Sequence, residues 1–204
     1  SQILSPGLEP FLEILPQETA FQPSVGVGTF DSPAFTNAQL ILLSFKAGVT
    51  ASASMDAGGF YDSHQDNDNQ QYLLLEHPND TLTYIWDYAE ELNIANRLTV
   101  VVSSDFCRTP HYNSQNGKDH WPTNSYMVMR KNAPWANQVL GQTDEFQNAY
   151  TIDPSTMALD SGSSGIIMSP GHIHKALRGE LGIANSSYDN QFNFNLLEDV
   201  NVFG

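Results

Sequence analysis

Aspartate and histidine side chains occur in four polar segments of the sequence, at spacings that could hold a metal ion. Asp62 and His64 stand two residues apart. In extended backbone, side chains at this spacing point the same way, so both could bind one ion. The other candidate ligands are Asp105, Asp119, His120, His172 and His174. Carboxylate and neutral imidazole are the ligands of zinc and similar divalent ions where thiolates are missing.

Each of these candidates also has a simpler explanation. A turn aspartate and a surface histidine would account for the first pair. Asp105 could cap a helix N-terminus, the commoner use of an aspartate at a strand end. Asp119 could orient the His120 imidazole rather than bind metal. His172 and His174 diverge in a helix, so we expect only one of them to face a site.

Arg108 is one of four arginines in a very acidic chain, and it follows the same valine-rich run as Asp105. An arginine just beyond a strand end can dock an anion, although an ion pair with one of the many carboxylates is equally consistent. Cys107 is the only cysteine, which excludes an internal disulfide and a thiolate zinc cluster. The run from Asp66 to Asn69 lacks the EF-hand pattern and is interpreted as a solvated acidic loop.

The composition excludes several classes of protein. The 204 residues carry 8 Lys and Arg against 23 Asp and Glu, a net charge of −15. Such a field repels nucleic acid and acidic lipid. No apolar run approaches the roughly 18 to 20 residues that would cross a bilayer. The shortage of cations suits an exported or high-salt protein, and the 40% apolar share is enough for a packed core.

The predicted elements begin after a proline-rich arm or covering loop at residues 1–36, followed by an α/β domain at residues 37–204. Apolar residues predict a helix over 38–45 that stops near Gly48. A strand is predicted over 49–55, and a loop rich in Asp, Asn and Gln then runs to Gln71. Apolar residues at three- and four-residue steps predict a helix over 72–92, with Asp80 or Thr81 as an N-cap for its second part.

The remaining elements complete an α/β pattern. LTVVV at residues 98–102 reads as a strand buried on both faces. Strand, helix and strand in this order predict a βαβ unit and a parallel or mixed sheet flanked by helices. Another strand is expected over 125–129, a helix from the Ser169 cap to near Gly182, and an edge strand in the tail. Because ligands bind beyond the carboxyl ends of parallel strands, we expect the candidate side chains to share one pocket.

Three motifs in order resemble a known family. They are GGFYDSH from Gly58, SDFCRT from Ser104 and GKDHW from Gly117. They are similar to the Gly-Gly-aromatic-Asp-Thr-His, Ser-Glu-Phe-Gly-Arg-Thr and Gly-Thr-Asp-His-Gly motifs of a bacterial exported family of the domain of unknown function 1501 type. Members often carry twin-arginine signals, and the family is allied in fold to the alkaline phosphatases and sulfatases.

The resemblance implies an alkaline-phosphatase-like fold in which Asp62 and His64 form a metal pair. Asp105 corresponds to the aspartate of the superfamily's Asp-His-Gly strand end. Phe106 stands where the phosphatases place a second-site histidine, which argues against a two-metal centre. Tyr61 is an extra residue relative to the motif. The phosphatase-like fold places its nucleophile and first metal-binding aspartate in an N-terminal half, so the chain resembles a C-terminal portion of that fold.

Two functions follow from these expectations. The first is metal-dependent hydrolysis of phosphate or sulfate esters, with zinc, manganese or calcium as the ion and Arg108 holding the anionic ester. The second is a non-catalytic secreted or surface protein that retains the fold for binding or structure. In a variant of either function, the chain is a subunit of a larger assembly, or a partner supplies the N-terminal half.

Overall fold

Residues 33–194 and 196–204 are described by the computed structural model, and they divide into two units. The first unit contains the described residues up to 101, together with 112–119 and 128–131. The second contains residues 102–111, 120–127 and 132–204. Most of the predicted arm lies outside the described residues, and a helix begins within its last four residues, at Pro33.

Two helices form the core of the first unit. The helix α2 (Pro33–Lys46) starts with proline, which is suited to the first helical position, and covers the helix expected over 38–45. Its apolar face packs against the helix α4 (Glu76–Glu91). The Phe35 and Tyr84 rings lie 5.3 Å apart, and Tyr84 stacks on Tyr88 at 5.7 Å. Burial of these aromatic rings contributes to the stability of this core.

The predicted helix over 72–92 is confirmed, but it is divided and begins earlier. The helix α3 (Asn67–Leu74) runs through part of the segment expected to be a loop, and α4 follows at Glu76. Asp66 is the N-cap of α3 and has a left-handed φ of 45°. Asp80 and Thr81 lie inside α4, so their predicted capping role is wrong. A short 3-10 helix, η1 (Ala95–Arg97), then leads into the first strand.

The predicted strand over 49–55 is wrong. This segment forms no strand, and residues 51–54 are exposed. The reason is that alternating Ala and Ser bury too little apolar surface to hold a strand against a neighbour. Without this strand, the expected βαβ unit does not form.

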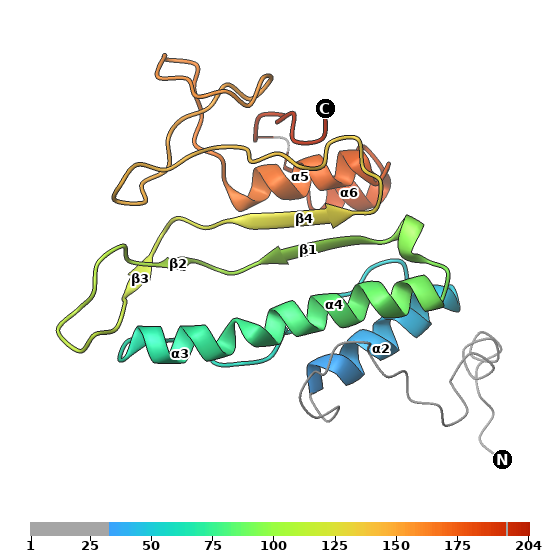
Figure 1. Ribbon diagram of the computed structural model, residues 1–204. Coiled ribbons are helices and arrows are strands. Elements are labelled where there is room, and N and C mark those ends of the chain that lie inside the picture. Colours follow the sequence, from blue (N-terminus) through green and yellow to red (C-terminus); the bar gives the residue numbers. More distant parts are fainter. Residues whose placement is uncertain (1–32, 195) are drawn as a thin grey trace. The chain divides into compact units, whose positions relative to one another are not determined.

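The two small sheets in the described part of the chain have two strands each. Strand β1 (Thr99–Ser103) pairs with β4 (Tyr126–Arg130), and the two run in opposite directions in Figure 1. Strand β2 (Cys107–Arg108) pairs antiparallel with β3 (His120–Trp121). The strands expected over 98–102 and 125–129 are therefore confirmed. The expected parallel pairing is not seen among the described strands. β1 is not buried on both faces, because alternate residues are exposed.

The second unit has its own apolar core beside the helix α5 (Pro170–Glu180). Its buried members come from α5, from the long connection before it and from the C-terminal segment: Ile152, Met157, Ile173, Val200 and Val202. The predicted helix from Ser169 is confirmed. The predicted edge strand of the tail is wrong, since the described residues after the short helix α6 (Ser187–Gln191) are irregular.

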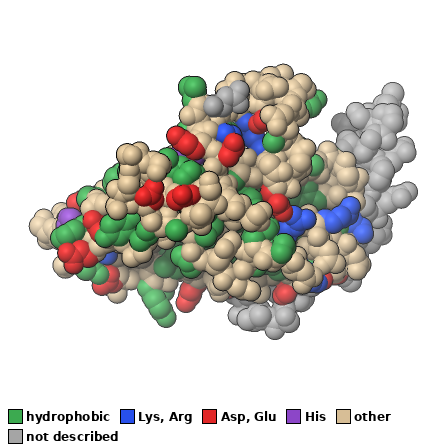
Figure 2. All heavy atoms as spheres, turned by 90° about the horizontal axis from the view of Figure 1, so that it is seen from above, with side chains coloured by type: hydrophobic (Ala, Val, Ile, Leu, Met, Phe, Trp, Pro, Cys, Tyr) green, Lys and Arg blue, Asp and Glu red, His purple; other side chains and the backbone are tan. Residues whose placement is uncertain are grey.

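The surface of the described residues is mainly acidic. No helix among the described residues is long and apolar enough to span a membrane. Figure 2 shows acidic side chains in several separate groups on one face, with fewer basic ones among them. The chain is thus a mixed α/β protein with small antiparallel sheets and an acidic surface.

Candidate metal site

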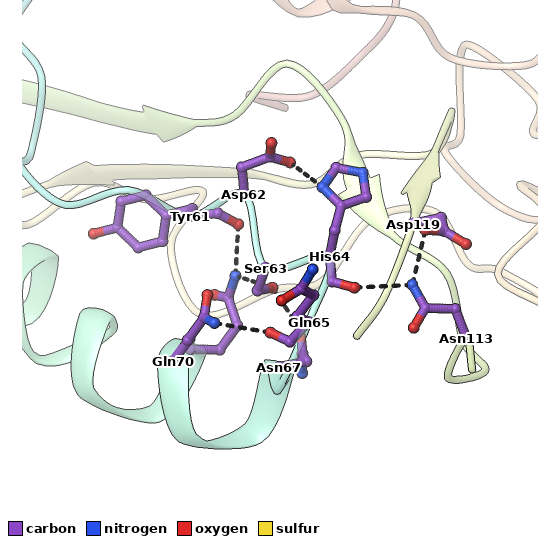
Figure 3. Close-up of polar contacts among 10 residues, drawn as sticks. Tyr61, Asp62, Ser63, His64, Gln65, Asn67, Gln70, Asn113 and Asp119 are labelled. Carbon is purple, nitrogen blue, oxygen red and sulfur yellow. Dashed lines mark hydrogen bonds and ion pairs between the residues drawn. The ribbon is translucent and has the colours of Figure 1, made fainter. Parts of the chain in front are cut away.

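The Asp62 and His64 side chains lie together on the surface of the first unit. The carboxylate Oδ1 of Asp62 is 2.9 Å from Nδ1 of His64, and each side chain is roughly two-fifths exposed, at 43% and 42%. Figure 3 shows both side chains on the same side of the loop before α3. The expectation that residues at this spacing point the same way is confirmed.

Ser63 points the opposite way and is fully buried, with 0% of its surface exposed. Its hydroxyl donates to Oδ1 of Asn67 at 2.7 Å and accepts from Nε2 of Gln71 at 2.9 Å. Gln71 also donates to the carbonyl oxygen of Tyr61 at 2.8 Å. The alternation of an extended segment therefore buries Ser63 against α3 and turns Asp62 and His64 outward.

The segment 112–119 supports the loop from its other side. The backbone N–H of Lys118 donates to the carbonyl oxygen of Ser63 at 3.0 Å. A single side chain, Asn113, donates both to the carbonyl oxygen of His64 and to Oδ1 of Asp119, each at 3.0 Å. Asn113 thereby joins the His64 backbone to the Asp119 carboxylate (Figure 3). No local sequence pattern indicates this role of Asn113, because its partner lies 49 residues away.

The contact between Asp62 and His64 is compatible with two ways of binding metal. A neutral imidazole that donates from Nδ1 has its lone pair on Nε2, so an ion at Nε2 would leave Asp62 as the group that orients the ring. Alternatively, an ion could replace the shared proton and bind Oδ1 and Nδ1 together. Two ligand atoms of a tetrahedral zinc ion lie about 3.3 Å apart, so the observed 2.9 Å requires only a small shift.

Three further candidate site residues, Asp105, Arg108 and His120, lie in the second unit at or next to the β2–β3 pair. Arg108 and His120 are directly opposite each other in its register. The His120 ring stacks on Phe106 at 4.0 Å, and the Arg108 guanidinium lies 5.7 Å from the centre of the same ring. Asp105 is exposed and is followed by β2, so its alternative role as a helix N-cap is wrong.

His172 and His174 lie on α5, and each has a local role. His172 is 4% exposed and belongs to the N-terminal cap of the helix with Ser169. His174 is exposed, and its ring lies 6.4 Å from that of Phe194. The expectation that the two diverge is confirmed. The single pocket expected for all the candidate ligands stays a prediction, since those residues are divided between two units.

A shallow pocket beside α3 was not expected from the sequence. It is lined by Asp66, Asp68, Asn69, Tyr112 and Asn116. The Tyr112 hydroxyl donates to Oδ1 of Asp68 at 2.6 Å, and this bond, with a second from Asn67, holds the pKa of Asp68 below its usual value. The Asp68 carboxylate that lines the pocket is therefore already hydrogen-bonded within the chain.

Cys107 has no sign of an activated thiol. The side chain is partly buried, and this burial raises the pKa of the thiol above its ordinary value. A raised pKa keeps the residue in the unreactive thiol form at neutral pH.

The fold and the loop motifs define a mixed α/β protein with an exposed carboxylate–imidazole pair. Residues 28–158 match the family model described as "Protein of unknown function (DUF1501)". The chain belongs to this family, as the three sequence motifs indicated. No curated protein and no solved structure matches the chain.

Proposed function

We propose that the chain binds a divalent metal ion through Asp62 and His64. The observation that carries the proposal is their 2.9 Å contact on a loop whose intervening residue is completely buried. A loop fixed in this way presents both side chains without the entropy loss of ordering a flexible segment. Nitrogen and oxygen donors suit zinc first, with manganese and calcium as alternatives.

The reaction class that we propose is hydrolysis of phosphate or sulfate esters in an exported protein allied to the alkaline phosphatases and sulfatases. A bound ion would supply charge stabilisation for the ester oxygen. Arg108 would hold the anion, while Asp105, Asp119 and His120 keep the metal-site roles that the sequence predicts. The support for this proposal is membership of the family and the sequence motifs.

The alternative is a non-catalytic binding or structural protein that retains the metal site. It is favoured by Phe106, which stacks on His120 where the phosphatases have a metal-binding histidine. A single ion without an assigned nucleophile can bind an ester without cleaving it. We therefore expect this chain alone to show little or no turnover of aryl phosphates or sulfates.

Metal binding is tested by elemental analysis and by calorimetric titration with zinc, manganese and calcium. The informative variants are Asp62→Ala and His64→Ala, and the matched control is His77→Ala, an exposed histidine on α4 in the same unit. We expect about one ion per chain, lost in both site variants and retained in the control. Equal binding in all four proteins would overturn the proposal.

Asp62→Asn separates the two binding modes. Asparagine keeps an oxygen that can accept from Nδ1 but removes the carboxylate charge. If Asp62 only orients the ring, the affinity should fall by about 10- to 100-fold. If Asp62 binds the ion directly, the loss should match that of Asp62→Ala. A chromogenic ester assay with each metal then decides between the catalytic and the non-catalytic function.

A further inference from the structure

A chain of hydrogen bonds in the second unit links a serine, a histidine and a glutamate. The Ser169 hydroxyl lies 2.8 Å from Nδ1 of His172, and Nε2 of the same ring lies 3.2 Å from Oε2 of Glu198. These distances are within the reach required of a nucleophile, its base and the group that orients the base. His172 is almost completely buried, so its ring is held between the two partners.

The position of the histidine proton follows from a third hydrogen bond. The backbone N–H of Ser169 donates to Nδ1 of His172 at 3.0 Å. Because an N–H group can only donate, Nδ1 carries the lone pair and Nε2 carries the proton. The Ser169 hydroxyl therefore donates to Nδ1, and Nε2 donates to Glu198. This is the arrangement in which His172 can accept the hydroxyl proton and Glu198 can stabilise the resulting imidazolium.

Ser169 and His172 also form a reciprocal capping box, in which the Ser169 side chain accepts from the His172 backbone N–H, but capping does not require the third partner, Glu198. A capping box normally has Glu or Gln at the third helical position, and only one side-chain acceptor is needed there. Ser186 shows the simpler form at α6, where its hydroxyl oxygen accepts from the backbone N–H of Asp189 at 3.1 Å. At α5 the acceptor is an imidazole whose second nitrogen is bound to an acid.

Leu197, the residue before Glu198, packs closely against Gly171 of α5. A Cβ atom on Gly171 would lie 2.5 Å from Cδ1 of Leu197, so a larger residue at position 171 would require the end of the Leu197 side chain to move. Lys175 donates to the Leu197 carbonyl oxygen at 2.7 Å and pairs with Asp199 at 2.8 Å. Hydrogen bonds from its own backbone N–H and from His172 hold the pKa of Glu198 below its usual value, which keeps its carboxylate ionised at neutral pH.

We propose that Ser169, His172 and Glu198 form a serine-nucleophile site that acts on uncharged carboxylic esters. The Ser169 oxygen attacks the ester carbonyl carbon while its proton moves to Nδ1 of His172. That proton then passes to the leaving alkoxide as the carbon–oxygen bond breaks, which gives an acyl-serine and an alcohol. Water attacks the acyl-serine, its proton moves to Nδ1, and the carboxylic acid leaves as the serine regains a proton.

Two local features favour an uncharged ester. At the start of α5, Pro170 has no N–H and the His172 N–H donates to Ser169, so the Gly171 N–H is the donor that would meet a developing oxyanion. Exposed apolar side chains lie two residues before the serine and two before the glutamate: Ile167 at 60% and Leu196 at 97% exposure. These surroundings suit an apolar acyl group.

The decisive test is covalent labelling of the full chain with a fluorophosphonate, in which the serine oxygen bonds to phosphorus and fluoride leaves. Mass spectrometry of the labelled chain should locate the modification at Ser169. A wild-type chain that stays unlabelled there would overturn the proposal, and this readout needs no variant to fold. We also expect hydrolysis of a p-nitrophenyl ester that persists in the presence of a chelator, which separates this site from the proposed metal site.

The variants assign the roles. Ser169→Ala should abolish labelling, and His172→Gln should lower its rate by at least about 100-fold. Glu198→Gln keeps a hydrogen-bond acceptor without the charge, and it should lower the rate while shifting the pH profile. Ser186→Ala removes a helix cap of the same kind and should leave labelling unchanged. Melting curves identify variants that fail to fold, and equal labelling in Ser169→Ala and wild type would contradict the assignment.

Discussion

Gly117 packs directly against the backbone of His64. A Cβ atom at position 117 would lie 1.8 Å from the His64 carbonyl oxygen and 1.9 Å from its carbonyl carbon. Neither atom can move aside as a flexible side chain could, because both belong to the backbone. The loop that carries Asp62 and His64 therefore depends on a residue without a side chain in the segment 112–119.

Gly117→Ala should consequently displace the His64 loop. We expect it to lower the free energy of unfolding by about 3 kcal/mol, at the upper end of overpacking effects, and to weaken metal binding. Denaturant unfolding and a zinc titration measure the two effects. The matched control is Gly179→Ala in α5, where the new methyl group meets nothing within 4 Å. The control should be neutral or stabilising, and similar losses in both variants would argue against the close contact.

Ser63→Ala should destabilise the loop through its buried polar partners. The change removes the donor to Asn67 and the acceptor for Gln71, which leaves both amide side chains without this bond. A cost of about 1–3 kcal/mol is expected for unsatisfied buried groups. Ser54→Ala, at an exposed position, is the control and should have little effect. Urea unfolding of the two variants provides the comparison, and equal midpoints would contradict the proposed role of Ser63.

Alkaline pH should destabilise the core of the first unit through Tyr84. Burial is the main cause that raises the pKa of Tyr84 from 10.0 to about 12, and the nearby Tyr88 and Glu91 add to it. The neutral phenol is favoured in the folded state, so its contribution is complete below pH 10 and is lost as the pH rises toward 12. A shift of this size corresponds to roughly 2–3 kcal/mol.

The measurement for Tyr84 is the free energy of unfolding of wild type and of Tyr84→Phe at several pH values. The difference between the two proteins should be constant below pH 10 and should shrink or reverse above it. Phenolate absorbance should also show one fewer late-titrating tyrosine in the variant. A difference that does not change with pH would refute the assignment.

Arg178→Lys should loosen α6 from α5. The Arg178 guanidinium donates to Oδ1 of Asp189 at 2.7 Å and to the carbonyl oxygen of Phe192, and it lies 4.5 Å from the centre of the Phe194 ring. Lysine keeps the charge but lacks the planar group that serves all three contacts. We expect faster amide hydrogen exchange in residues 187–191, with α5 less affected. Lys175→Arg is a charge-conserving control on the same helix, and unchanged exchange in Arg178→Lys would contradict this role.

The sequence predicted the elements whose signals are local. Apolar periodicity identified α4, and a serine cap followed by proline identified α5. The first part of helix α3, residues 67–71, was missed because the sequence NDNQQYLL has little apolar periodicity, and its contacts with the preceding loop are polar. The pairing of β1 with β4 was missed because strand pairing depends on residues far apart in the sequence.

The same distinction applies to the candidate site. The relation of Asp62 to His64 follows from the two-residue period of extended backbone, so the sequence alone was sufficient to predict it. Asn113 carries no such signal, because its bond to the His64 carbonyl oxygen joins segments 49 residues apart. The shared orientation of Asp62 and His64 can thus be inferred from their spacing, whereas the side chains that support their loop can be found only in the structure.

The course of the polypeptide has a consequence for gene truncation. The chain leaves the first unit after residue 101, returns at 112, leaves after 119, returns at 128 and leaves again after 131. A recombinant fragment ending at residue 101 would keep Asp62 and His64 but lose Asn113 and Gly117. A shortened chain would therefore keep Asp62 and His64 together with the segment that supports their loop only if it extended beyond residue 119.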